Sequence, residues 1–491
     1  MKTRFLLLLI LPFLTFEING QNQEDALRYS RTSLLGSARY MAMGGAYGSI
    51  GADISGLSIN PAGIGIFRKS EFMFTPLITF NQTEVNYMGE FRDDTKYNLG
   101  LSNIGFVLAS DLSQKKESGW KKIQFGFNFN RTNNFTNRVF IEGFNNNSSL
   151  LTAYIYEADG LHPDDLDPFT TGLAYDAWLI WPTDNSNEVY TADAYMGGVM
   201  QHQTIYSSGS MSEMLFTLGA NYGDRVYFGA SVGIPYIRYS YESVYTETDP
   251  LDRHDYFVSM TRRENLDTKG SGFIFKLGTI IRATDWLRLG AAFHSPTYFS
   301  GINEEWRYSM SSELLFDNKI ERRSADSPRG RFEYELTTPM KAIGSATILF
   351  GKMGLVSAEY EFADYSDIRL NSSGYKFVKE NQAIRDSYTA AHNLRFGTEW
   401  RLNDVYLRGG YALLGSPYKS QVNDGKGSQV SLGLGFRQQD YYIDLAWVGS
   451  TYKEVRYMYP VPQGQGLDYY TPVANQTFNR QLYMLTFGWR F

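Results

Sequence analysis

Hydrophobic and polar residues alternate with a period of two through most of the chain after Glu71. In the last segment the two faces carry these residues: Tyr483, Leu485, Phe487, Trp489 and Phe491 on one, and Met484, Thr486, Gly488 and Arg490 on the other. Residues 123–130, 226–234, 430–437 and 443–448 repeat the pattern, with one apolar face and one polar or glycine-rich face. Such alternation predicts β-strands whose two faces meet different surroundings.

Fourteen segments have this character. We predict strands at residues 71–86, 97–111, 121–133, 205–221, 225–247, 269–283, 286–308, 331–350, 354–372, 390–402, 405–418, 427–438, 441–459 and 475–491. Connections after even-numbered strands are short and carry the Gly, Asp and Asn residues that tight turns need. Connections after odd-numbered strands are long and polar, and the longest runs from about residue 134 to 204.

The same alternation would also fit a soluble periplasmic β-protein with its apolar face inward. The length of the segments, the aromatic residues near their ends and the alternation of short and long connections favour a barrel in a membrane. The chain also ends on Phe491 after an aromatic-rich strand, as outer-membrane barrels commonly do. We therefore predict an all-β fold: a fourteen-stranded antiparallel transmembrane β-barrel, closed by pairing of its first and last strands.

The amino terminus predicts export from the cytoplasm. Lys2 and Arg4 precede an apolar run at residues 5–16, and this run is too short to span a bilayer. We interpret residues 1–20 as a signal peptide with cleavage near Gly20, the alternative being an anchored amino-terminal helix. The predicted domains are this signal peptide, an amino-terminal segment at 21–70, and a barrel at 71–491 with a long extracellular loop at about 134–204.

Composition narrows the chemistry. The 491 residues include no Cys, which excludes disulfides, thiolate metal sites, a Cys nucleophile and a lipoprotein acyl anchor. The net charge of −6 is spread along the chain and gives no sign of nucleic-acid binding. Aromatic residues make up 16% of the chain, which is high for a soluble enzyme and fits the aromatic girdles of a membrane barrel.

One stretch stands apart from the strands. Ser37 to Arg68, the small-residue segment, is rich in Gly, Ala and Ser and has Asn60-Pro61-Ala62-Gly63 near its carboxyl end. A segment so poor in bulky side chains makes a weak core of its own. We expect the rest of the chain to enclose it.

These features together resemble the FadL/TodX family of outer-membrane transporters for long-chain fatty acids and other hydrophobic compounds, in the variety common in Bacteroidetes. Residues 36–65, GSARYMAMGGAYGSIGADISGLSINPAGIG, are similar to the amino-terminal hatch of that family. The resemblance implies that residues 21–70 form a hatch inside the lumen. It also implies passive uptake: a ligand is captured by extracellular loops, the hatch shifts, and the ligand leaves sideways through the barrel wall.

Two groups of residues are the candidate sites. Asn60, Pro61, Ala62 and Gly63 are expected to form a hatch or gating element, although Pro and Asn also suit a fixed turn. Trp178, Leu179, Ile180 and Trp181 form an apolar cluster inside a polar loop. Exposed apolar patches often mark binding, so this cluster is a candidate for ligand capture. The alternative is a core that folds the loop onto itself.

Other polar groups have ordinary interpretations. Asp164, Asp165 and Asp167 could hold Ca²⁺, but their spacing differs from an EF-hand loop, and a solvated acidic loop is favoured. His162 and His202 flank the long loop and could ligate haem, but the five histidines show no binding pattern. Four charged residues are expected to form networks on the inner barrel wall: Arg395, Glu399, Arg437 and Arg490. We expect no metal and no cofactor.

The sequence therefore predicts an outer-membrane channel that takes up hydrophobic small molecules and is not an enzyme. Its expected partners are the hydrophobic ligand, outer-membrane lipid and, through the extracellular loops, another protein, with no nucleic acid. The main alternative is a non-transporting barrel that acts as a scaffold in an outer-membrane secretion or assembly complex. A phospholipase or protease with a catalytic triad at the rim is a third interpretation.

Overall fold

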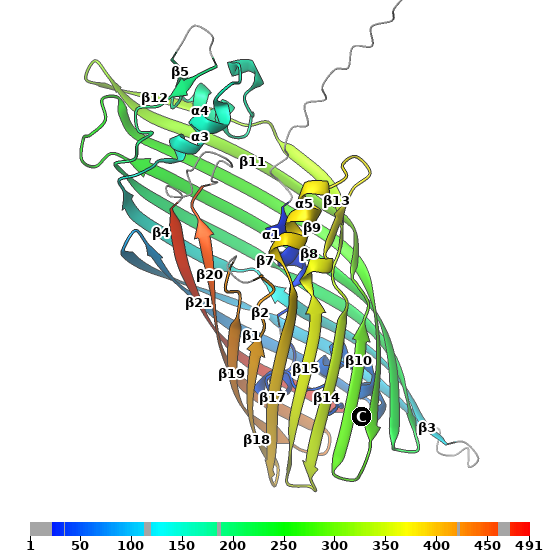
Figure 1. The fold of residues 1–491 in the computed structure, drawn as a ribbon. Helices are drawn as coiled ribbons and strands as arrows, with labels where there is room; N and C mark the ends of the chain where they lie inside the picture. Colours follow the sequence, from blue (N-terminus) through cyan, green and yellow to red (C-terminus); the bar gives the residue numbers. More distant parts are fainter. Residues whose placement is uncertain (1–21, 34, 112–118, 184–187, 420–422, 460–471) are drawn as a thin grey trace, which may run out of the picture.

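The computed structural model describes residues 22–33, 35–111, 119–183, 188–419, 423–459 and 472–491. The predicted signal peptide lies outside these residues. The described chain forms an antiparallel β-barrel (Figure 1). Its fourteen wall strands are β1 (Glu71–Tyr87), β2 (Glu90–Asp111), β3 (Trp120–Asn134) continued by β4 (Asn137–Asn145), β7 (Val199–Tyr222), β8 (Val226–Thr248), β9 (Phe257–Arg282), β10 (Leu287–His294) continued by β11 (Tyr298–Phe316), β12 (Lys319–Asp326) continued by β13 (Gly330–Thr337) and β14 (Lys341–Phe350), β15 (Gly354–Asp364) continued by β16 (Arg369–Asn371), β17 (Ala390–Leu402), β18 (Val405–Leu414), β19 (Gly427–Arg437), β20 (Tyr441–Tyr457) and β21 (Val473–Arg490).

Pairing of the first and last strands closes the barrel. β1 and β21 are antiparallel in a register that runs from Glu71 opposite Arg490 to Asn86 opposite Asn475. The fourteen-stranded, closed antiparallel barrel predicted from the sequence is confirmed. Among the described residues no helix has both the length and the apolar character needed to cross a membrane.

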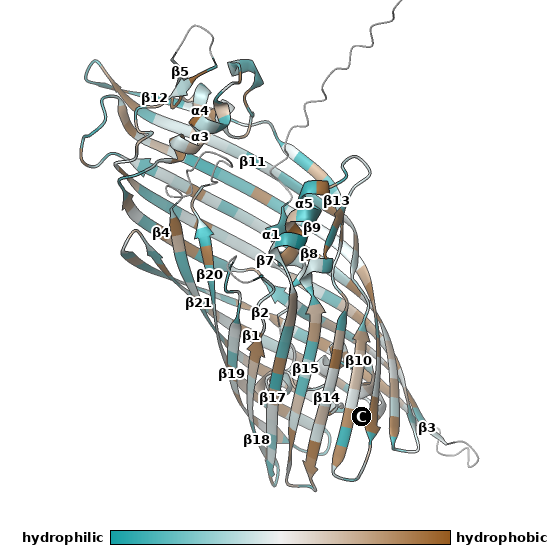
Figure 2. Ribbon diagram, in the orientation of Figure 1, coloured by the Kyte–Doolittle hydropathy of each residue, from teal (hydrophilic) through white to brown (hydrophobic). Residues whose placement is uncertain are grey.

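The alternation along each strand separates an apolar outer face from a polar inner face. On β21, Tyr483 and Trp489 are about half exposed on the outside, whereas Thr486 between them is fully buried inside. Figure 2 shows the hydrophobic residues concentrated in the lower half of the wall strands. Aromatic clusters mark the borders of this band, with Phe72, Phe74 and Trp489 near the short turns and Phe80 and Tyr97 on the opposite side.

The wall has very unequal height. β7, β8 and β9 have 24, 23 and 26 residues, whereas β18 and β19 have 10 and 11. The long strands extend beyond the band of outward apolar residues and form a tall sheet (Figure 1). A cap packs against this sheet, formed by α3 (Leu150–Ala158), η3 (Pro163–Asp165), α4 (Thr171–Asp176), β5 (Trp181–Pro182) and β6 (Tyr190–Thr191).

Several predicted boundaries were wrong at this tall end. The predicted loop at 134–204 begins and ends in strand, because 137–145 form β4 and β7 begins at 199, so the connection is 146–198. The strand predicted at 269–283 begins at 257. Its added part was missed because the exposed residues there, Arg263, Asn265 and Asp267, are polar and not apolar. Strand pairing continues past the apolar band, so hydrophobicity alone underestimates the strand lengths.

The amino-terminal part of the described chain lies inside the barrel. It contains α1 (Gln23–Ser30), α2 (Ala38–Ala42), η1 (Ser55–Ser58) and η2 (Pro61–Ile66). The side chains of Asn22 and Ser37 cap the two α-helices by accepting hydrogen bonds from backbone N–H groups of the first turn. Two further elements lie near α1. η4 (Tyr365–Asp367) lies between β15 and β16, and α5 (Val378–Ser387) lies between β16 and β17 and contacts α1.

Candidate functional site

The small-residue segment lies directly against glycines of the barrel wall. A Cβ atom built on Gly229 of β8 would lie 2.2 Å from the carbonyl carbon of Pro61, and one on Gly278 of β9 would lie 1.9 Å from Asn60 Oδ1. Cβ atoms built on Gly219 of β7 and Gly290 of β10 would lie equally close to Ile64 and Gly48, respectively. On the opposite wall, Cβ atoms would overlap residues 42–44 at three more glycines: Gly397, Gly410 and Gly433. The wall is therefore shaped to receive this segment, which packs closely against opposite sides of the barrel.

Asn60 binds the segment to two wall strands at once. Its Oδ1 accepts a hydrogen bond from the backbone N–H of Ala62 (3.0 Å) and so begins η2. Its Nδ2 donates to the carbonyls of Gly48 (2.6 Å), Thr279 of β9 (3.1 Å) and Ala291 of β10 (3.4 Å). Asn60 is 1% exposed, so water cannot hydrogen-bond to its side chain, and these protein bonds satisfy its polar atoms instead.

A buried charge network anchors the other end of the segment. Arg39 makes two 2.7 Å bonds to the carboxylate of Glu399, which also accepts a 2.6 Å bond from Arg408. Asp444 accepts bonds from Arg408 (2.7 Å) and Arg437 (2.8 Å). Three more ion pairs lie on the inner wall: Arg395 pairs with both Glu359 and Glu361, and Arg490 pairs with Glu71. The four residues expected to form networks on the inner wall do so.

One acid of the segment itself is buried beside this network. Asp53 accepts hydrogen bonds from the Ser37 hydroxyl (2.7 Å) and from the backbone N–H of Ser55 (2.9 Å). Burial raises the pKa of the Asp53 carboxyl, while Arg39 and the Ser37 hydrogen bond act in the opposite direction. Asp53 therefore links the start of α2 to the start of η1 inside the segment.

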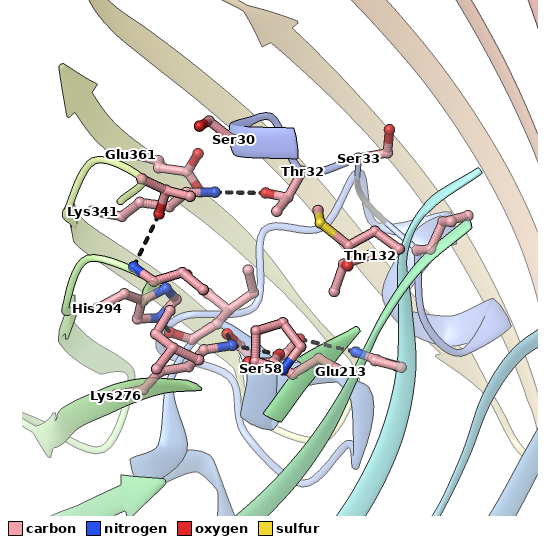
Figure 3. Close-up of a pocket in the computed structure, with 18 of the residues that line it drawn as sticks. Ser30, Thr32, Ser33, Ser58, Thr132, Glu213, Lys276, His294, Lys341 and Glu361 are labelled. Carbon is pink, nitrogen blue, oxygen red and sulfur yellow. Dashed lines mark hydrogen bonds and ion pairs between the residues drawn. The ribbon is translucent and has the colours of Figure 1, made fainter. Parts of the chain in front are cut away.

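A polar cavity of about 90 Å³ lies between α1 and the small-residue segment (Figure 3). Two of its side chains hold the segment by its carbonyls. Lys276, which is paired with Glu213 at 2.7 Å, donates to the carbonyl of Ser58 (3.3 Å). His294 Nε2 donates to the carbonyl of Ile59 (2.8 Å). Sequence reasoning missed this cavity, because its walls come from strands far apart in the chain.

The wall is interrupted between β2 and β3. Their ladder ends at Asn103 opposite Asn130, and residues 90–102 of β2 pair only with β1. At residues 134–136 the chain bends into the lumen, where the side chains of Asn81 and Arg480 donate to the carbonyls of Thr136 and Asn134. β4 continues beyond the bend and pairs with β7 alone. A gap in backbone pairing therefore separates β2 from β4.

Side chains bridge this gap at its outer end. Arg92 of β2 pairs with Glu142 of β4, and Arg138 of β4 pairs with Asp94 of β2. Closer to the bend, the Asn98 amide lies 3.5 Å from the Thr136 hydroxyl. The separation between the two strands thus depends on side-chain contacts, which can change without unfolding the barrel.

The predicted capture residues gather in the cap. Trp178, Leu179, Ile180 and Trp181 line a pocket of about 520 Å³, together with Tyr256, Phe257, Leu314 and Phe316 from the tall sheet. Leu179 and Ile180 are buried, whereas the two Trp side chains are partly exposed. The guanidinium of Arg323 lies 3.9 Å over the Trp178 ring and holds it against the pocket. The cluster therefore packs the cap and also lines a pocket, and its role in ligand capture stays a prediction.

The other candidates are not brought together. His162 caps η3, and His202 lies beside Glu142 on β7, so the two histidines are not a pair of ligands. Asp167 accepts from the backbone N–H of Phe169 and stabilises a local turn. Within the described part of the chain no group of three or more His, Asp or Glu side chains is arranged to hold a metal ion.

Known proteins resemble this chain in structure. No protein-family model matches it, and no curated protein matches its sequence. A FadL homologue of Pseudomonas aeruginosa superposes with a TM-score of 0.55 at 14% identity, covering 94% of this chain and 100% of that one. The toluene transporter TodX of P. putida gives 0.54 at 12% identity over 94% and 99%, and the Ralstonia pickettii toluene transporter TbuX gives 0.52 at 13% over 93% and 98%.

Two of these three neighbours, TodX and TbuX, are toluene transporters. The shared fold covers nearly the whole of both chains in each comparison. The chain therefore shares the fold of the FadL and TodX transporters, as its sequence predicted.

Proposed function

We propose that this protein is an outer-membrane channel for the passive uptake of hydrophobic small molecules, long-chain fatty acids or aromatic hydrocarbons among them. The observation that carries this proposal is the gap between β2 and β4 in a barrel whose lumen holds the small-residue segment. A closed lumen with an interrupted wall gives an apolar molecule a route into lipid that avoids the aqueous side. Each CH₂ group that stays out of water on this route avoids an unfavourable transfer free energy of about 0.8 kcal/mol.

The cap pocket supports a role in capture. It presents apolar and aromatic side chains at the outer end of the tall sheet, where a molecule arriving from outside meets the protein first. The hydrophobic core around Leu179 and Ile180 continues to Val139 and Ile141 of β4, next to the gap. A continuous buried apolar core therefore connects the lining of the capture pocket with the strand beside the proposed exit.

We assign the gating role to Asn60, Pro61, Ala62 and Gly63. Asn60 bonds to carbonyls of β9 and β10, and Lys276 and His294 hold the two preceding carbonyls from the polar cavity. A ligand with a carboxylate, such as a fatty acid, would compete in this cavity for Lys276 and His294 and so loosen the segment. Such a shift would break no ladder of the wall.

A reversible cross-link tests the exit. The chain has no Cys, so Asn98→Cys/Thr136→Cys introduces a single pair whose disulfide would fasten β2 to the bend. We expect cells that express the oxidised variant to take up radiolabelled oleate and toluene no faster than cells without the protein. Reduction with dithiothreitol should restore uptake to the level of the unmodified protein.

A second pair on the same two strands is the control. Leu108 and Phe125 are already paired in the ladder below the gap. A disulfide in the Leu108→Cys/Phe125→Cys variant therefore leaves the gap between β2 and β4 open. Uptake should be the same before and after reduction. Uptake that persists in the oxidised Asn98→Cys/Thr136→Cys variant would contradict lateral exit, and absence of uptake by the unmodified protein would contradict transport itself.

The capture pocket gives a further prediction. Trp181→Ala removes a partly exposed wall of the pocket and leaves the buried Leu179 and Ile180 in place. We expect uptake at low oleate concentration to fall several-fold, while uptake at saturating concentration stays unchanged, because only the first encounter is weakened. Val189→Ala, a partly exposed apolar residue of the same cap outside this pocket, should leave both rates unchanged.

A further inference from the structure

The cap pocket carries negative charge on walls that are otherwise mainly apolar and aromatic. The described residues that line it include two acids, Asp176 and Asp193, and no Lys, Arg or His. One cation lies close by, because the Arg323 guanidinium covers the Trp178 ring at 3.9 Å, but Arg323 is itself paired with Glu321 at 2.6 Å. The charge of the lining is therefore negative and is not cancelled from within the pocket.

The Asp193 carboxylate is held in a fixed position. Its Oδ2 accepts hydrogen bonds from the backbone N–H groups of Tyr256 (2.7 Å) and Phe257 (2.8 Å), where β9 begins. Its Oδ1 is not buried and has no partner among the described residues. Asp176, the last residue of α4, is exposed and its side chain likewise makes no hydrogen bond or ion pair with a described residue. Both carboxylates thus have oxygens that a ligand can use.

Aromatic rings form a continuous part of the wall. The Tyr256 and Phe316 rings lie 5.3 Å apart between centroids, and Phe316 meets the edge of Trp178 at 6.4 Å. Trp178 has a left-handed backbone with φ of 58°, which is unfavourable for a bulky residue, so the cap holds this ring in place at a cost in stability. Tyr256, Trp178 and Trp181 are 47%, 48% and 38% exposed, so parts of all three rings are open to a ligand.

We propose that the cap pocket selects ligands that carry a positively charged nitrogen beside an aromatic or other apolar body, namely amphiphilic amines and quaternary ammonium compounds. Aromatic faces attract cations, and a carboxylate adds a charge-assisted interaction with the nitrogen. A metal ion fits less well, because Ca²⁺ takes about six to eight oxygen ligands and the pocket offers two carboxylates. This inference rests on the proposed role of the pocket in capture and narrows its ligand class.

The charge of the head group then decides which hydrophobic molecule the pocket holds best. A neutral molecule gains only the apolar contacts, whereas an ammonium ion gains these and the attraction of Asp176 and Asp193. The acyl chain of a fatty acid can enter, but its carboxylate meets like charge and stays at the mouth of the pocket. The pocket therefore ranks ligands by charge as well as by apolar surface.

Three probes with the same phenylbutyl body test this ranking: 4-phenylbutylamine, 4-phenylbutan-1-ol and 4-phenylbutanoate. At about pH 7 they are a cation, a neutral molecule and an anion. Equilibrium dialysis of each radiolabelled probe against the full-length protein in nanodiscs of zwitterionic lipid gives its Kd, and empty nanodiscs correct for partition into lipid. We expect the amine to bind about tenfold more tightly than the alcohol, because its hydrogen bonds are charge-assisted, and the carboxylate to bind most weakly.

Variants of the two acids assign the preference to the pocket. Asp176→Asn/Asp193→Asn should weaken binding of the amine about tenfold and leave the alcohol within about twofold, because the shape of the pocket is kept. Asp176→Asn alone should weaken the amine severalfold and leaves the backbone hydrogen bonds of Asp193 intact. Asp164→Asn/Asp165→Asn removes two exposed acids of the same cap outside the pocket and should leave all three probes within about twofold.

Equal affinities for the amine and the alcohol would overturn the proposal, as would tighter binding of the carboxylate or failure of the amine to bind. Equal weakening of the amine by the Asp164→Asn/Asp165→Asn variant would also overturn it. Dialysis requires no transport, so the two proposals fail separately. The predicted order of binding in a protein that takes up neither oleate nor toluene would contradict the channel and support the assignment of the pocket.

Discussion

Gly229→Val is expected to turn a sealed barrel into a conducting one. A Cβ atom at this position would lie 2.2 Å from the carbonyl carbon of Pro61, 2.3 Å from its oxygen and 2.4 Å from the nitrogen of Ala62. These are backbone atoms, so no side-chain rotation relieves the overlap. Overpacking of this kind costs about 1–3 kcal/mol or more, and the small-residue segment is the part that can move away.

The wall itself should tolerate the change, because valine suits a strand better than glycine does. We expect normal insertion, followed by steady ion currents across planar bilayers where the unmodified protein shows almost none. Gly344→Val on β14 is the control, since nothing lies within 4 Å of a Cβ there. A Gly229→Val protein that stays closed would show that the segment does not seal the lumen.

Glu399→Leu is expected to cost about 3–5 kcal/mol of stability, since removing one partner of a buried network leaves the others charged and unpaired. Arg39 would lose both of its bonds to that carboxylate, and Arg408 would keep only Asp444. Urea unfolding of the protein in lipid vesicles measures the change. Arg39→Met/Glu399→Leu should recover part of the loss, because the uncompensated cation of the segment is then absent.

Glu305→Leu provides the comparison. Glu305 pairs with Arg329 and Arg331, whose side chains are mostly exposed, and exposed pairs contribute only about 0–1 kcal/mol. If Glu399→Leu were no more destabilising than Glu305→Leu, the buried network would not be what anchors the small-residue segment. The same pair of variants therefore tests whether burial, and not the number of ion pairs, determines the strength of the anchor.

The barrel could be predicted because each strand carries its own information. The alternation from Tyr483 to Phe491 assigns a lipid face and a lumen face without reference to any other strand. The turn residues at 223–224 and 403–404 mark where pairs of strands join. Closure then follows, because an open sheet edge in lipid leaves backbone groups unpaired. The position of the small-residue segment could be inferred for a similar reason, from its lack of bulky side chains.

The gap between β2 and β4 could not be predicted in this way. Residues 137–145 were assigned to the long loop, and nothing local shows that they form β4, that β4 pairs with β7 alone, or that Asn81 and Arg480 hold the bend inside the lumen. The polar cavity could not be predicted either, because Lys276 and Ser58 come together only when the barrel closes. Pairing partners far apart in the chain are a property of the whole fold.

The candidate site residues could be predicted in part. Asn60 was singled out by turn chemistry and Trp178 by its apolar neighbours, yet the carbonyls that Asn60 binds and the rings of Tyr256 and Phe316 come from distant strands. The glycine-rich inner face of strands such as β8 was visible in the sequence. That this face fits the backbone of residues 60–62 became clear only from the positions of the strand and the segment in the structure.

The free edge of β2 also affects how the protein behaves among its neighbours. Unpaired strand edges are templates on which another chain can add a strand, and they lead to association and aggregation. The exposed part of this edge carries Glu90, Asp93 and Lys96, and such charges discourage a foreign strand from pairing. The edge is thereby kept open within one molecule without becoming a site of polymerisation in a crowded membrane.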